Sequence, residues 1–355
     1  MNNKKIIRNI ILMLKFSKVF VVLFVIAISF SSCTKTDTPE SKDKKDTTNS
    51  NLIVKDSTGE KISLVYKPKV GDIFRYKVFN ATAAKELSPI TQDKELNTTQ
   101  DITFYITEEV TEVNDNGTIT FKVKYDSISV LQKISSDGKD LSQNYNSNIK
   151  DSIYAKPDYV EFNSLINNPF KMRVSPKGEI IEAYELENIH NAVYKAFGDT
   201  LSSKDKEIVK EKINSEYFKF YLQNTFQQFP DFSVAKDSVW IKTDEELLTQ
   251  FPAKRILTYK VSDIKTENGS TIVTIDANLG YEILEKKIQE KGFSATLDEV
   301  NTTGTGKIIF NITKGCIVNK TTERNAAMTI GMNIGGQKAK SVQSLYIKSV
   351  IELIN

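Results

Sequence analysis

The side chains of this chain that could carry out chemistry are few. The sequence of 355 residues holds one histidine, His190, and two cysteines, Cys33 and Cys316. A single histidine excludes a His-rich metal site and leaves one candidate for a histidine base. His190 lies beside the apolar positions of a predicted helix, and no serine or cysteine partner is fixed near it. We therefore expect it at the boundary of the core and not in a catalytic triad.

Two segments imitate ligand-binding loops. Gly331 to Gly336 has the glycine spacing of a phosphate-binding loop, but Gln337 occupies the position of the essential lysine. Residues 112–123 begin like a calcium-binding loop, but Val123 stands where a bidentate glutamate is required. Carboxylates are plentiful, and no catalytic pair can be chosen among them. The sequence therefore predicts no metal site, no cofactor and no enzymatic activity.

Cys33 has the most specific predicted chemistry. Residues 1–18 carry five basic side chains and no acidic one, and the apolar run from Val19 to Phe30 follows. This run is too short for an ordinary transmembrane helix, and it leads into Ser31-Ser32-Cys33, which is the order of a bacterial lipoprotein signal. We expect that residues 1–32 are removed and that a fatty acid such as palmitate is attached at Cys33. An ordinary signal peptide with an incidental cysteine is the alternative.

Cys316 is not expected to react. If Cys33 carries lipid, Cys316 is the only remaining thiol, so an intramolecular disulfide is impossible. It precedes Ile317 and Val318 in an apolar run. We predict a small buried side chain at this position.

The expected mature chain begins with a polar tether and carries almost no net charge. Thr34 to Ser50 contains no large apolar residue, which predicts disorder, and we assign residues 33–60 to the tether. Without the signal segment, 43 basic residues face 45 acidic ones. This balance predicts no nucleic-acid partner, and a membrane is reached through the N-terminal lipid.

Thr47 and Ser57 are candidate O-glycosylation sites on the tether. Each follows an aspartate and precedes a threonine, in a motif that resembles the O-glycosylation acceptor of Bacteroidota. The motif occurs more often in the chain than its composition predicts. Aspartate followed by serine is also common in turns, so both interpretations stay open.

The elements that must position these residues are mostly β-strands. Apolar and polar residues alternate with period two through most of the chain, as in Phe74 to Val78 and Ile119 to Tyr125. Asn116-Gly117 and Asn268-Gly269 separate such runs and predict tight hairpins. Pro176-Lys177-Gly178 predicts a third hairpin. The fold class is therefore α+β, mostly antiparallel β with a few helices.

Two helices are predicted between the strands. Ala183 to Phe197 has one apolar face and ends before Gly198. Lys204 to Phe229 opens with the capping pair Ser202 and Asp205 and ends before a proline.

The second half of the longer helix is apolar on nearly every side, although packing on a sheet requires only one apolar face. The additional rings either pack against another part of the protein or line a pocket for an apolar ligand such as an acyl chain. The residues expected to line such a pocket are Tyr217, Phe218, Phe220, Tyr221 and Phe226.

The strand pattern repeats once in the same order, although chance similarity among hairpins is the alternative. We predict two related sheet-plus-helix units, residues 61–230 and 231–355, with Trp240 buried at the start of the second. The matching pairs are Gly71-Asp72-Ile73-Phe74 with Lys236 to Trp240, Asn116-Gly117 with Asn268-Gly269, and Lys177-Gly178 with Lys314-Gly315.

These features together resemble a known family. The signal at Cys33, the opening Gly71-Asp72-Ile73-Phe74, the hairpin from Val174 to Ile180 and the second opening Asp237-Ser238-Val239-Trp240 resemble uncharacterised Bacteroidota lipoproteins with a domain of unknown function. The resemblance covers most of the mature chain and implies no catalytic residues. In architecture alone, the pattern is also similar to periplasmic lipoprotein carriers and lipid-binding lipoproteins.

The expected function follows from these features. We predict a non-enzymatic lipoprotein of the bacterial cell envelope, anchored in the outer membrane, that binds an apolar ligand or a protein partner. A structural or assembly role in an envelope complex is the second hypothesis, and exposed apolar patches would favour it. An enzyme of unrecognised type is the third, and a cleft with several carboxylates of perturbed pKa would favour it.

Overall fold

The computed structural model describes residues 53–56, 59–91, 94–150, 159–198, 201–290 and 292–354. The predictions for the signal peptide, for Cys33, Thr47 and Ser57 and for most of the tether lie outside these residues.

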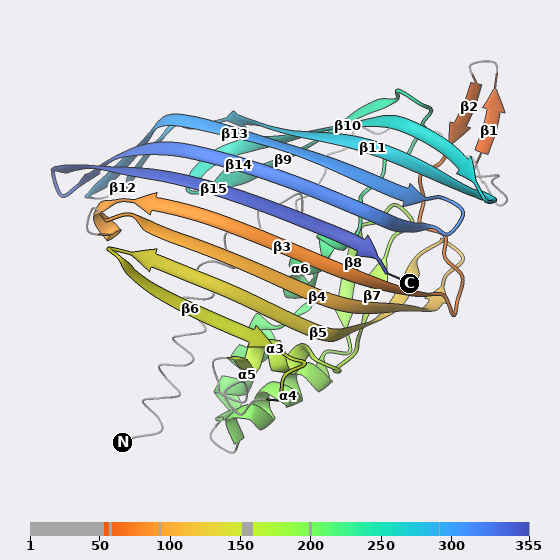
Figure 1. Ribbon diagram of the computed structural model, residues 1–355, viewed down its shortest axis with the longest axis horizontal. Coiled ribbons are helices and arrows are strands. Elements are labelled where there is room, and N and C mark those ends of the chain that lie inside the picture. The colour runs from red at the N-terminus through yellow and green to blue at the C-terminus, as the bar shows by residue number, and fades with distance from the viewer. Residues whose placement is uncertain are drawn as a thin grey trace.

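Most of the described chain forms one antiparallel sheet of 13 strands (Figure 1). Buried and exposed side chains alternate along its long strands, because successive residues of a strand point to opposite faces. The prediction of a mostly antiparallel β fold with few helices is confirmed. The strands follow one another across the sheet in the order β8 (Ile180–Tyr184), β7 (Phe170–Val174), β5 (Ile119–Ser136), β4 (Leu96–Val113), β3 (Ile73–Leu87), β15 (Gln337–Leu353), β14 (Cys316–Ile334), β13 (Phe293–Asn311), β11 (Ser270–Ile283), β10 (Phe251–Glu267) and β9 (Val239–Leu248).

Smaller strands complete the β-structure. β6 (Lys139–Asn146) pairs with β5, and β12 (Lys287–Glu290) pairs with β13. β1 (Ile53–Asp56) and β2 (Gly59–Ile62) form a separate two-stranded sheet. A short 3-10 helix, η1 (Pro89–Thr91), follows β3.

The strands of the two predicted units join in one continuous sheet. β3 pairs with β15, from Tyr76 opposite Leu353 to Leu87 opposite Val342. Five strands lie on each side of β15 in this order, and on each side they follow one another in reverse sequence order. They are β8-β7-β5-β4-β3 on one side and β14-β13-β11-β10-β9 on the other. The duplication stays a prediction. All the described helices lie in the first predicted unit, so the described part of residues 231–355 is not the sheet-plus-helix unit that the repeat predicted.

The hairpin turns differ in how they use their glycines. Asn268 and Gly269 have φ angles of 51° and 76°, and the flanking residues Glu267 and Ser270 pair directly. This is the predicted tight hairpin, in which both turn residues take positive φ. In Asn116-Gly117 only Gly117 has a positive φ, 80°, within a longer loop.

The helical region departs from the prediction of one long helix from Lys204 to Phe229. The capping box of Ser202 and Asp205 is confirmed and opens α5 (Ser203–Lys212), which ends long before Phe229. A second helix, α6 (Ser215–Leu222), begins because the side chain of Asn214 accepts a hydrogen bond from the backbone N–H of Tyr217 at 3.0 Å. A 3-10 turn, η5 (Gln223–Thr225), follows, and the chain is then extended.

The remaining helices are α3 (Val160–Leu165), which the sequence pattern did not predict, and α4 (Glu187–Phe197). α4 ends before Gly198, as predicted, but it begins at Glu187 and not at Ala183, which lies in β8. His190 on α4 lies 2.7 Å, through Nε2, from the carbonyl oxygen of Ile213. The histidine therefore ties α4 to the junction between α5 and α6, and its position at the core boundary is confirmed.

The core lies on the face of the sheet that carries α6 (Figure 1). The ring of Tyr66 packs among Phe226, Phe229 and Phe310, with centroid separations of 5.1 to 5.5 Å. The extended segment after α6 thus brings the first and second sets of strands together.

Two predicted core residues are confirmed. Trp240 is buried and stacks on Tyr259 at 5.2 Å, while its neighbours Val239 and Ile241 are exposed. The side chain of Cys316 is also buried, and its thiol is free.

Candidate functional site

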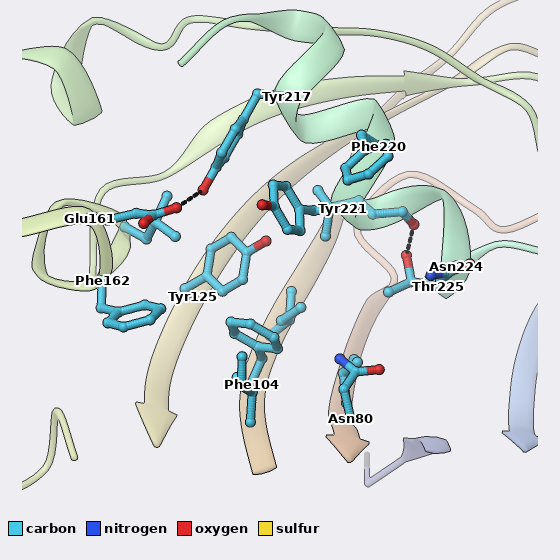
Figure 2. Close-up of a pocket in the computed structure, with 15 residues that line it drawn as sticks. Asn80, Phe104, Tyr125, Glu161, Phe162, Tyr217, Phe220, Tyr221, Asn224 and Thr225 are labelled. Atoms are coloured by element: carbon cyan, nitrogen blue, oxygen red, sulfur yellow. Dashed lines mark hydrogen bonds between the residues drawn. The ribbon is translucent and has the colours of Figure 1, made fainter. Parts of the chain in front are cut away.

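A pocket lies between the sheet and the helices α3 and α6 (Figure 2). Strands β3, β4 and β5 form its floor with side chains such as Val78, Ile102 and Ile106. Its volume is about 50 Å³, which is room for a few water molecules. Six aromatic rings contribute to the lining, those of Phe104, Tyr125, Phe162, Tyr217, Phe220 and Tyr221.

The structure places three of the five predicted lining residues on this pocket. Tyr217 and Tyr221 lie one turn apart on α6 and share the face that points into it, and Phe220 lies at its edge (Figure 2). Phe218 and Phe226 do not line it, which corrects their predicted position.

Phe218 and Phe226 are core residues for two different reasons. Phe218 points from α6 toward β7, where its ring centroid lies 4.3 Å from that of Phe170. Phe226 lies beyond the helix, in the extended segment, and packs against Tyr66 and Phe121. The helical spacing assumed for Phe226 fails because the helix has already ended at Leu222.

Among the described residues, one acidic side chain lines the pocket. The hydroxyl of Tyr217 donates a hydrogen bond to Oε1 of Glu161 at 2.8 Å (Figure 2). Burial raises the pKa of Glu161, and this hydrogen bond partly opposes the shift. The hydroxyls of Tyr125 and Tyr221 point into the same space. The pocket thus combines apolar walls with a small polar group, which is the usual composition of a small-molecule site.

Glu161, Tyr125 and Phe104 were missed by sequence reasoning. They come from α3, β5 and β4, and only the tertiary fold brings them beside α6. The alternation along β4 and β5 predicted that Phe104 and Tyr125 face inward, but it carried no sign that a pocket lies there.

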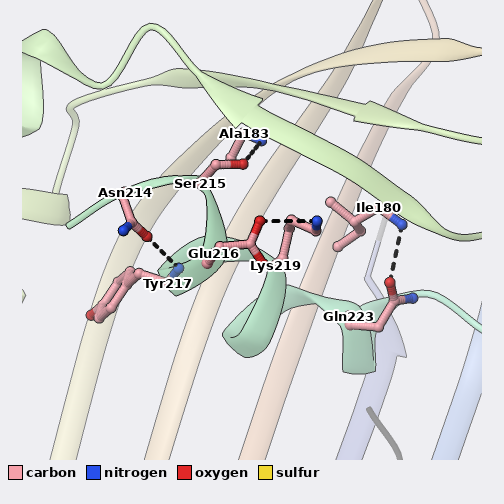
Figure 3. Close-up of polar contacts among 8 residues, drawn as sticks. All are labelled: Ile180, Ala183, Asn214, Ser215, Glu216, Tyr217, Lys219 and Gln223. Atoms are coloured by element: carbon pink, nitrogen blue, oxygen red, sulfur yellow. Dashed lines mark hydrogen bonds and ion pairs between the residues drawn. The ribbon is translucent and has the colours of Figure 1, made fainter. Parts of the chain in front are cut away.

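The edge strand β8 holds α6 in place (Figure 3). Ser215 Oγ accepts a hydrogen bond from the backbone N–H of Ala183 at 2.8 Å, and Gln223 Oε1 accepts one from that of Ile180 at 3.0 Å. Gln223 Nε2 donates to the carbonyl oxygen of Gly178 at 2.8 Å. These side chains bind the edge of the sheet and fix the helix above the pocket.

Other groups with perturbed pKa values face the core instead of the pocket. Burial raises the pKa of the Cys316 thiol to about 12, which suppresses the reactive thiolate. Burial raises the pKa of Glu108 to about 8 and lowers that of Lys320 to about 7. Lys320 Nζ donates to the carbonyl oxygen of Asn224 at 3.1 Å. None of these three groups is among the side chains that line the pocket.

The described residues contain neither a metal-binding cluster nor a membrane-spanning helix. Within this part of the chain, no three His, Cys, Asp or Glu side chains gather closely enough to hold a metal ion. None of the helices described above combines the length and the apolar character needed to cross a membrane.

Comparison with protein families gives one match. The sequence pattern of DUF6263, a family of unknown function, matches residues 116–317. No curated protein matches the chain.

Solved structures show only distant similarity. A structure of lipid–protein interactions in lipovitellin is 12% identical and covers 82% of this chain, with a TM-score of 0.41. The chain spans about a quarter of the lipovitellin chain, 25% of its length. The structure of Pseudomonas aeruginosa OccK7 (OpdD) has 5% sequence identity to this chain and a TM-score of 0.21. The match covers 80% of this chain and 100% of the OccK7 chain.

Proposed function

The chain belongs to the DUF6263 family, whose function is unknown, and we propose that it binds the apolar part of a lipid or similar amphiphile in the pocket under α6. The observation that carries this proposal is the set of six aromatic side chains that line the pocket. Binding is favoured because apolar ligand surface leaves water for an apolar lining. The proposed role requires no chemical step.

The size of the pocket limits how the ligand enters. A volume of about 50 Å³ is smaller than the roughly 150 Å³ of a cavity that holds benzene. Only the end of an acyl chain fits without a rearrangement. Phe220 lies at the pocket and is 40% exposed, so its ring can turn outward at little cost in buried surface and admit more of the chain.

Phe220→Asp is expected to weaken the binding of a fluorescent fatty-acid probe at least about tenfold, which corresponds to roughly 1.4 kcal/mol. The charged carboxylate would have to lose its water next to the apolar ligand. Titration of the folded protein with the probe measures this change. The matched control is Phe232→Asp, since Phe232 is 54% exposed and lies outside the pocket, and it should leave the affinity unchanged.

Two outcomes would contradict the binding proposal. Either the folded wild-type protein fails to bind the probe, or Phe220→Asp and Phe232→Asp weaken binding equally. Phe218→Asp is unsuitable as a test because Phe218 is a fully buried core residue, and its replacement would unfold the protein.

We also propose that the protein is attached to the bacterial cell envelope through lipid on Cys33, on the outer membrane. The support is the order of basic, apolar and small residues before this cysteine. Cys33→Ala should leave an unprocessed or soluble form where the wild type is in the membrane fraction. Fractionation and N-terminal mass spectrometry test this, and an unmodified mature N-terminus with unchanged fractionation would refute it.

A further inference from the structure

A row of uncharged polar side chains crosses the sheet beside the pocket. Gln100 on β4 lies opposite Gln132 on β5 and opposite Thr82 on β3. Directly paired residues point to the same face of a sheet. All three side chains are nearly inaccessible, with exposed fractions of 1% for Gln100 and 3% for each of the other two.

These side chains lack hydrogen-bond partners. Both amide atoms of Gln100, the amide nitrogen of Gln132 and the hydroxyl of Thr82 are buried without a partner. Ser349 lies on the neighbouring strand β15, opposite Asn80 of β3, and its hydroxyl also has no hydrogen-bond partner. Buried polar groups are nearly always hydrogen-bonded. Four side chains on adjoining strands, each with at least one unpartnered polar atom, therefore require an explanation.

The row continues the floor of the pocket. Ile102 and Asn80 line the pocket, and Gln100 and Thr82 lie two residues farther along the same strands. Residues two apart share a face and are separated by about 7 Å along the strand. A ligand with its apolar end in the pocket would thus place its next atoms over this row.

Building on the proposed function, we infer that Thr82, Gln100, Gln132 and Ser349 bind the headgroup of the same amphiphile, and that this headgroup is an uncharged glycosyl or polyol group. We name these four residues the polar row. Its amides and hydroxyls offer both donors and acceptors. Hydroxyl groups of a sugar or polyol also donate and accept, so they can satisfy both kinds of site.

The surroundings of the polar row favour a headgroup without charge. Thr82, Gln100 and Gln132 lie in one row, and Ser349 lies in the next row toward the pocket, with Val130, Ile102 and Asn80. The next row away from the pocket on the same face is Ile134, Thr98 and Ala84. None of these side chains is charged. In the other direction, beyond Ile347, Arg324 already stacks on Tyr281 at 5.1 Å. A bare carboxylate or ammonium over Gln100 and Gln132 would lose water without an opposite charge on either adjoining row.

Three amphiphiles with the same alkyl chain distinguish the headgroups. Dodecyl maltoside, dodecanoate and dodecyltrimethylammonium are used below their micellar concentrations to displace the fluorescent fatty-acid probe. We expect the maltoside to bind about tenfold more tightly than either charged amphiphile, the effect of one or two net hydrogen bonds. Equal affinities for the three headgroups would overturn the inference.

Gln100→Leu tests the role of the polar row directly. It should weaken maltoside binding about tenfold, leave dodecyltrimethylammonium binding unchanged, and raise the melting temperature of the free protein by removing an unsatisfied amide. Gln132→Leu should act in the same direction. The control is Gln289→Leu on β12, where the side chain is exposed, and it should change none of these quantities.

The outcomes separate this inference from the proposed function. If no dodecyl compound or probe binds, the pocket proposal itself fails. If all three amphiphiles bind and Phe220→Asp weakens them all, while Gln100→Leu and Gln132→Leu leave the headgroup preference unchanged, the pocket binds apolar chains and the polar row does not read the headgroup.

Discussion

Glu108→Gln is expected to stabilise the folded protein by about 3 kcal/mol at pH 7 and to leave its stability unchanged at pH 4. Glu108 lies on β4 between Phe74 and Val123 of the neighbouring strands. Its side chain is 2% exposed, and its Oε1 atom has no hydrogen-bond partner. Burial raises the pKa of its carboxyl from 4.5 to about 8.

The sign of this effect follows from proton binding. Between pH 4.5 and 8 the carboxyl of Glu108 is ionised in the unfolded chain but stays protonated in the folded one. The unfolded state binds fewer protons, so the free energy of unfolding falls as the pH rises. Above pH 8 the decrease in the free energy of unfolding levels off at about 5 kcal/mol. Glutamine does not ionise, so the free energy of unfolding of the variant does not decrease in this way.

Denaturant unfolding of both proteins from pH 4 to pH 9 measures the difference. Burial lowers the pKa of Lys320 to about 7, so this residue makes the free energy of unfolding rise with pH above pH 7. Both proteins contain Lys320, so its contribution cancels in the difference between them. The control is Glu109→Gln, whose side chain is 44% exposed and lies 3.9 Å from Lys122. It should change stability by no more than about 1 kcal/mol at any pH. Parallel pH profiles for wild type and Glu108→Gln would show that the carboxyl is solvated in the folded state.

The strands were predictable from the sequence because their information is local. Alternation along Ile119 to Tyr125 follows from one face of the strand being buried, and Asn268-Gly269 supplies the two positive φ angles of its turn. The union of all long strands in one sheet was not predictable. It depends on the pairing of β3 with β15, whose residues are more than 250 positions apart in the sequence.

The helices and the site show where local patterns fail. The aromatic residues from Tyr217 to Phe229 were assigned to one helix, but Asn214 caps a new helix and Phe226 enters the core from extended chain. The dipeptide Asn214-Ser215, a common helix start, was the signal that could have located this break. The apolar half of the pocket was thus partly predictable, whereas Glu161 reaches it only through tertiary packing.

The polar row and Glu108 differ in how the cost of burying a polar group can be reduced. Glu108 faces the core near Tyr66 and Tyr76, outside the pocket, and burial raises its pKa so that it stays neutral. Gln100 and Gln132 stay uncharged at any pH, and they adjoin a pocket. On the proposed binding of a headgroup, the ligand would satisfy their amides, whereas protonation alone lowers the cost of burying Glu108.

Gly178→Ala is expected to destabilise the protein by about 2 to 5 kcal/mol. Gly178 has a φ of +88°, and a Cβ atom there would lie 2.2 Å from the carbonyl oxygen of Gln227 and 2.6 Å from the ring of Tyr66. The left-handed backbone costs an alanine about 1 to 2 kcal/mol, and the forced displacement of core atoms adds about 1 to 3 kcal/mol.

Gly269→Ala separates these two costs. Gly269 has a similar φ of +76°, but a Cβ atom there would meet nothing within 4 Å. Its replacement should therefore cost only the backbone part, about 1 to 2 kcal/mol, in urea unfolding. Equal losses for the two variants would mean that the segment around Tyr66 and Gln227 yields without strain. A larger loss for Gly178→Ala indicates that this hairpin is fixed against the segment that follows α6, and hence that the support of the pocket is rigid.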